Sequence, residues 1–208
     1  STYENVDGAV AVSPHFSWSV RIRPLKLFFD ARMSYDFSRD PSYVEDRLNV
    51  AYRHVPGLSL KLTSDFSRKY RLELRTATSY SEVRNTGYRN VSYLDQNVSL
   101  QSKNQITGWM FVNADYTYMM RHPFKGAGRP LHDHRLNAMA GFRIPNSGVE
   151  INLSCYDILN MTSSFKTTVV SNYTQTTFNP NFGRIYLVTV LWRFNSTQKG
   201  GNVSFGHR

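Results

Sequence analysis

Residues 25–37 read LKLFFDARMSYDF, and this stretch decides the fold. Every second residue is apolar or aromatic, while the residues between them include Lys26, Asp30 and Arg32. Successive side chains of a strand point to opposite faces, so the segment predicts a strand with one apolar and one charged face. At about thirteen residues it is longer than the ~5–6 of an ordinary strand. It approaches the ~9–11 tilted residues that cross a bilayer.

The same alternation recurs along the chain and predicts about nine strands. We expect them at residues 14–23, 25–37, 45–66, 69–84, 91–101, 108–120, 134–144, 148–158 and 183–195. The connections are expected to alternate between tight turns and longer polar links, as in outer-membrane barrels. The longer links are expected at 38–44, 85–90, 121–133 and 160–182.

The predicted fold class is all-β: an antiparallel, up-and-down transmembrane β-barrel with about nine or ten strands. The strands occupy residues 1–195, and residues 196–208 are expected to form a polar tail. We expect these strands to be one part of a larger barrel. In the last strand Tyr186 and Trp192 flank Val188 and Val190, the order expected of a girdle of aromatic side chains around an aliphatic middle.

Composition narrows the classes of function. The chain is 40% hydrophobic, and its one cysteine, Cys155, excludes an intrachain disulfide. The net charge of +10 invites a nucleic-acid interpretation, but the basic residues alternate with apolar ones along strands. We therefore expect no nucleic acid as a partner. A basic barrel favours anionic solutes inside it or anionic lipopolysaccharide around it.

The patterns examined for enzymes favour none. His132-Asp133-His134 has ligand chemistry, but without a third partner at metal-site spacing we expect a polar loop that faces water. The carboxylates of the alternating strands are expected to pair with lumen cations across strands. No nucleophile elbow or phosphate-binding glycine loop is found. The sequence thus predicts a protein that is not an enzyme, with no cofactor and no metal.

Solute binding is instead predicted on the lumen face, where charged residues share one alternation phase. The expected ligand-binding residues are Arg21, Lys26, Arg32, Lys61, Arg75, Asp115, Arg135 and Arg143. Because the cations outnumber the acids, we expect an anionic or heavily hydroxylated solute. Further contacts are expected in the links 121–133 and 160–182, since binding residues concentrate on loops held by a rigid scaffold.

Three short motifs lie in the last part of the chain: HRLN at 134–137, CYDILN at 155–160 and RIYLVTVLWRF at 184–194. Together they resemble the closing strands of TonB-dependent outer-membrane receptors, and most closely the outer-membrane β-barrel family of the Bacteroides type. The resemblance implies a bacterial outer-membrane location and uptake of a scarce solute, such as a siderophore or an oligosaccharide, through a plugged lumen. It also implies outer-membrane lipid and lipopolysaccharide, TonB and a plug domain as partners.

The family's plug domain matches nothing in these residues, so we expect the chain to be the C-terminal portion of a larger receptor. Two alternatives stay open. One is a soluble, secreted, all-β binding protein of lectin-like type. The other is a small complete outer-membrane barrel that acts as an adhesin or a membrane enzyme.

Overall fold

The chain forms a large antiparallel sheet in a computed structural model that describes residues 7–44, 47–67, 69–126, 129–161, 165–169, 174–178 and 183–193. Its strands are β1 (Val10–Val12), β2 (His15–Ile22), β3 (Leu27–Val44), β4 (Arg47–Ser67), β5 (Tyr70–Asn85), β6 (Val91–Gln105), β7 (Met110–Lys125), β8 (Leu131–Arg143), β9 (Val149–Tyr156), β10 (Phe165–Val169), β11 (Thr174–Phe178) and β12 (Ile185–Trp192). A 3-10 turn, η1 (Arg23–Leu25), joins β2 to β3. The predicted tail, with Phe194, lies outside the described residues.

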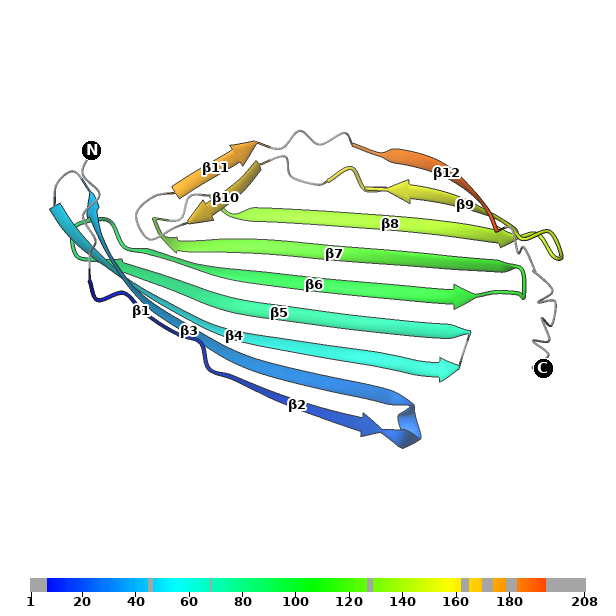
Figure 1. Ribbon diagram of the computed structural model, residues 1–208, viewed down its shortest axis with the longest axis horizontal. Coiled ribbons are helices and arrows are strands. Elements are labelled where there is room, and N and C mark those ends of the chain that lie inside the picture. Colours follow the sequence, from blue (N-terminus) through cyan, green and yellow to red (C-terminus); the bar gives the residue numbers. More distant parts are fainter. Residues whose placement is uncertain are drawn as a thin grey trace, which may run out of the picture.

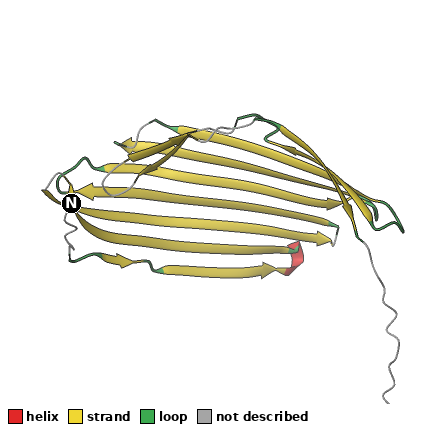
Figure 2. Ribbon diagram, turned by 45° about the horizontal axis from the view of Figure 1, so that its top comes forward, coloured by secondary structure: helices red, strands yellow, loops and turns green. Residues whose placement is uncertain are grey.

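Ten strands make one sheet in the order β1-β3-β4-β5-β6-β7-β8-β9-β12, and β2 also pairs with β3 (Figure 1). Every ladder is antiparallel, and strands β3 to β9 pair in chain order, as predicted. Strands β10 and β11 form a separate hairpin between β9 and β12, within the predicted link 160–182. Figure 2 shows the sheet bending as a whole, with η1 in red.

The sheet is open. Strands β2 and β12 lie at opposite edges (Figure 1), and no ladder joins these edges among the residues that the structure describes. The antiparallel all-β class is confirmed, whereas the closed barrel expected from the sequence is not formed by these residues.

Two of the links predicted from polar composition are largely strand. β3 continues to Val44 in register with β4, and β7 and β8 leave only residues 126–130 between them. The strict alternation of short and long links is therefore wrong. Pro41 and Pro123 each lie where the strand has one described partner. The β1 ladder reaches β3 only as far as Arg39, and β8 begins opposite Arg121. A proline costs no ladder bond on an unpaired side.

The sheet has two ends. We call the end with η1 and residues 106–109 and 144–148 the turn end, and the end with residues 86–90 and 129–130 the loop end. A small core lies at the loop end, formed by Ala51, Val83, Val91 and Tyr93. Beside it, the buried Asn49 donates a hydrogen bond to the Asn85 side chain (3.2 Å) and accepts one from the backbone of Gly87 (3.0 Å). This packing explains why polar segments remain extended beyond the predicted strand ends.

Candidate functional site

The sheet has two chemically different faces, and the strand register carries each face across most of the sheet. The apolar face is exemplified by one row of partners that crosses six strands. That row is Phe29, Leu62, Leu74, Leu100, Tyr116 and Leu136. Trp18 of β2 and Val188 of β12 belong to the same face through their partners Ala31 and Leu153. The side chains of alternate residues point to the opposite, polar face, as the sequence predicts.

Apolar side chains on one face are exposed, whereas polar side chains on the other face are buried. On the apolar face, Val188 is 66% exposed, Val190 63% and Trp18 53%. On the polar face, Glu73 is 7% exposed and Thr63 8%. A water-soluble sheet has the opposite arrangement, because burial of apolar surface is the main favourable term in folding.

Aromatic side chains and histidines gather at the loop end of the apolar face. The hydroxyls of Tyr116 and Tyr118 are hydrogen-bonded to Nδ1 of His134 and His132, each at 2.9 Å. At the turn end of the same face, the rings of Trp109 and Phe142 stack with their centroids 6.3 Å apart. The apolar face is thus bordered at both ends by aromatic side chains, which resembles the two girdles of a membrane barrel.

The polar face carries a concentration of cations around one acid. The Glu73 carboxylate lies 3.6 Å from Lys61 Nζ and 3.6 Å from the Arg71 guanidinium, and it also accepts a hydrogen bond from Arg75. Three cations therefore share a single, nearly buried carboxylate. The predicted cross-strand pairing of acids with lumen cations is confirmed here and at Arg143, whose Nε lies 3.1 Å from Glu150.

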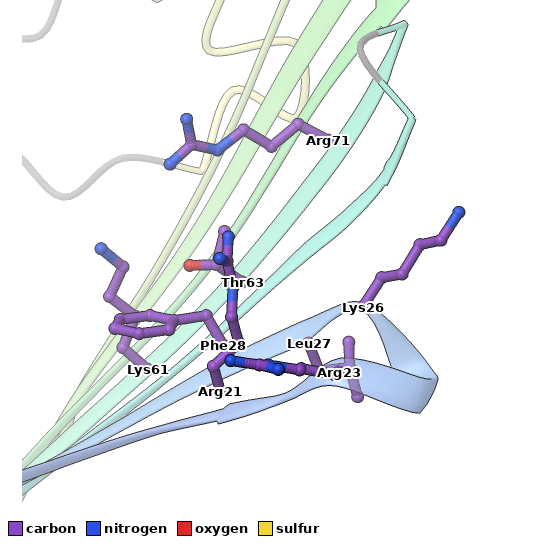
Figure 3. A pocket seen from close by; sticks show the side chains of 8 residues that line it. All are labelled: Arg21, Arg23, Lys26, Leu27, Phe28, Lys61, Thr63 and Arg71. Atoms are coloured by element: carbon purple, nitrogen blue, oxygen red, sulfur yellow. The ribbon is translucent and has the colours of Figure 1, made fainter.

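A hollow of about 580 Å³ opens on the polar face at the turn end, between η1 and β4 and β5 (Figure 3). We call it the basic pocket, and its lining residues are Arg21, Arg23, Lys26, Leu27, Phe28, Lys61, Thr63 and Arg71. In Figure 3, Lys61 and Arg71 extend to the same side as the Phe28 ring, whereas the Lys26 ammonium points away from this group. Lys26 lies in the turn, with φ at 49°, and not within a strand as expected.

Two smaller hollows continue the basic pocket along the same face. One, of about 310 Å³, is lined by residues that include Asp30, Arg32 and Lys61. The other, of about 190 Å³, is lined by Arg71, Glu73, Arg75, Gln101 and Lys103. Lys61 and Arg71 are each shared with the basic pocket, so the three hollows form a continuous basic floor on β2 to β6.

Five of the eight predicted ligand-binding residues lie on this floor: Arg21, Lys26, Arg32, Lys61 and Arg75. The other three lie elsewhere. Asp115 on β7 accepts a hydrogen bond from the Asn137 side chain at 2.8 Å, Arg135 is on β8, and Arg143 pairs with Glu150 near the turn end of β8 and β9. The described residues of the predicted link 121–133 lie at the loop end, and so do β10 and β11 of the link 160–182, away from the basic pocket (Figure 1).

Sequence reasoning did not select other members of the floor, among them Thr63, Arg23, Phe28, Arg71 and Lys103. The alternation already placed Phe28 and Arg71 on the charged face. What was lacking was the register, which sets Phe28 opposite Thr63 and Arg71 opposite Lys103. Arg23 was expected at the end of the strand 14–23, on the charged phase, but the structure places it in the turn η1.

The expected polar loop at residues 132–134 is wrong. These residues are part of β8, which begins at Leu131. His132 and His134 pair with Met120 and Tyr118 on the apolar face, while Asp133 lies on the polar face. The alternation of the strand therefore separates the acid from the two imidazoles, and the three side chains do not converge on one ion.

The chemistry available on the basic floor is the binding of anions through guanidinium, ammonium and hydroxyl donors. No helix in the described part of the chain is long and apolar enough to cross a membrane. Comparison with known proteins identifies no relative: no family model, no curated protein and no solved structure matches this chain.

Proposed function

We propose that this chain forms a stretch of barrel wall in a bacterial outer-membrane receptor of the TonB-dependent type, which takes up a scarce solute. The observation that carries the proposal is the exposure of the apolar face, with polar side chains buried on the opposite face. An apolar face left in water forfeits the free energy that drives folding, about 25 cal/mol for each Å². Contact with lipid would cover the exposed apolar face, and a path for solute along the opposite face would account for its polar side chains.

The height of the apolar band supports a bilayer. In β8 the stretch from His134 at one border to Phe142 at the other is nine residues long and spans about 26 Å at ~3.3 Å per step. Strands tilted by about 45° need ~9–11 residues to cross a membrane. The strands that continue beyond His134 and Tyr118 toward the loop end would then project from the membrane.

The receptor identity, in contrast, is supported by the resemblance of the three C-terminal motifs alone. Under this proposal the apolar face contacts outer-membrane lipid and lipopolysaccharide. The polar face lines a lumen that holds a plug domain, and TonB supplies the energy for uptake of a solute such as a siderophore or an oligosaccharide. The reading frame upstream of this chain should then encode a plug segment, and its absence would favour a different barrel protein.

Neither alternative has an observation in its favour. A soluble lectin-like sheet would bury its apolar residues, yet Val188 and Trp18 are exposed. A small complete barrel needs a ladder between β2 and β12, and the described residues form none. A wall segment of a larger barrel accommodates both findings, because further strands would pair with the two edges.

Membrane fractionation tests the proposal. We expect the protein, expressed in a Gram-negative host, to sediment with the outer membrane, to resist extraction by alkaline carbonate and to dissolve only in detergent. Release by carbonate into a monodisperse, folded form without detergent would contradict the membrane proposal. That result would support the secreted binding protein instead.

A further inference from the structure

The basic pocket gathers like charges that nothing in its lining neutralises. Arg21, Arg23, Lys61 and Arg71 line it, and none of its described lining residues carries a carboxylate. Two acids lie beside the pocket. Glu73 already shares its one negative charge among three cations. Asp30, opposite Lys61 in the ladder, accepts a hydrogen bond from the Ser19 hydroxyl. Like charges on neighbouring strands destabilise a sheet, so the local excess of positive charge favours an anion in the pocket.

Two uncharged members of the lining give the pocket further binding groups. Thr63 is 8% exposed, and its hydroxyl has no hydrogen-bond partner among the described residues. A buried polar group without a partner costs free energy, which a ligand that bonds to it recovers. Phe28 lies opposite both Arg21 and Thr63 in the ladders and is 40% exposed, so its ring is open to a ligand on the polar face.

We propose that the basic pocket binds a small solute with at least two negative charges, on phosphate or carboxylate groups. The Arg21 and Arg71 guanidiniums and the Lys61 ammonium hold the charged groups, since charge-assisted hydrogen bonds are the strongest available in proteins. The Thr63 hydroxyl donates to an anionic oxygen. The Phe28 ring packs against the uncharged part of the solute.

The same phosphate chemistry occurs on lipid A, and the position of the pocket distinguishes the two sources. The pocket opens on the polar face, while acyl chains would lie against the apolar face. The ligand is therefore a free solute. The inference rests on the proposed function, because it takes the solute to be the transported cargo or a counterion bound in the lumen. Binding of the solute can be measured without transport.

Calorimetry on the full chain in detergent tests the inference, with inorganic pyrophosphate as the probe. We expect binding that weakens when sodium chloride rises from 50 to 500 mM, because salt screens exposed charges. The double variant Arg21→Gln/Arg71→Gln should bind at least tenfold more weakly. The control Arg47→Gln/Arg53→Gln removes the same charge at the loop end and should bind as the parent does. No binding to the parent, or equal losses in both double variants, would overturn the site.

A single variant covers the case in which the double variant fails to fold. Thr63→Val removes the buried hydroxyl with little change of shape, so the stability should not fall while pyrophosphate affinity drops severalfold. Unchanged affinity in a folded Thr63→Val protein would refute the role of this pocket.

Detergent-dispersed lipid A serves as the second probe. We expect lipid A to leave pyrophosphate binding unaffected. If lipid A instead competes with pyrophosphate, and the double variant Arg21→Gln/Arg71→Gln no longer binds lipid A, the pocket binds a lipid headgroup and the proposal of a free solute is refuted. A negative result in any of these binding experiments does not change whether the protein resists extraction by carbonate. Failure of the pocket proposal is therefore distinguishable from failure of the membrane proposal.

Discussion

The two faces of the sheet are built from the same strands but differ in how their side chains interact. On the apolar face, many valine and leucine side chains are exposed, and aliphatic side chains form no hydrogen bonds or ion pairs with their neighbours. On the polar face, Glu73, Lys61 and Arg75 are held in mutual contact. The difference teaches that the apolar face needs only its composition to be right, whereas the polar face depends on which residue lies opposite which. Substitutions on the two faces should therefore fail in different ways.

The largest effect is expected from a charge on the apolar face. Val188→Arg or Val190→Arg should lower the free energy of unfolding in lipid vesicles by about 2–4 kcal/mol, because a cation at the middle of a bilayer is poorly solvated. Thr189→Arg lies between them on the polar face, opposite Asn152, and serves as the control. Urea titration of the reconstituted protein measures both. Equal tolerance at the two positions would contradict the assignment of the faces.

A smaller loss is expected on the polar face when its shared acid is neutralised. Glu73→Gln leaves Lys61, Arg71 and Arg75 without their carboxylate and should cost about 1–3 kcal/mol. Glu82→Gln breaks a more exposed pair with Arg84 and should cost less than about 1 kcal/mol. Denaturant unfolding at low and high salt compares them, and a loss at Glu82 that matches the loss at Glu73 would show that the cation cluster has no special cost.

The smallest effect is expected at the loop end. Replacing residues 126–130 with an Asn-Gly turn should change stability by less than about 0.5 kcal/mol, since shortening a surface loop changes little closure entropy. Deleting residues 121–133 instead removes Arg121, which pairs with Asp95 at 2.6 Å and lies over the Tyr93 ring, and should be clearly destabilising. Heat-modifiable mobility on gels after refolding reports both. If the protein still assembles after the longer deletion, the parts of β7 and β8 that it removes do not contribute to stability.

Much of the fold was predictable from local pattern. Leu62, Leu74 and Leu100 each belong to an alternating run, and the structure places them on one face as expected. The polar strand β6 had the weakest pattern, yet it pairs along its whole length with its two neighbours. The strand ends were less predictable, because Pro41 and Pro123 are turn residues by composition and are tolerated in strands only where one side is unpaired.

The candidate site was predictable in kind but not in membership. Arg21, Lys61 and Arg75 were expected to share a polar face, and they do. That Thr63 lies between Phe28 and Glu73, with its hydroxyl unpartnered, follows from two separate ladders and from no local signal. Asp115 has the right phase and lies opposite Gln101 of the floor, but neither it nor Arg135 on β8 lines one of the three hollows.

The alternating pattern of residues was enough to predict an all-β chain, the pairing of β3 to β9 in order and one apolar face for each strand, because a period of two admits a single backbone geometry. Only the tertiary structure decided that the sheet is open, that polar segments extend the strands and that cations from β2, η1, β4 and β5 meet in one pocket. The physical reason is that alternation assigns a residue to a face, while the position along that face depends on the register between strands far apart in sequence. Register is set by the whole ladder of hydrogen bonds and side-chain contacts, which no single segment contains.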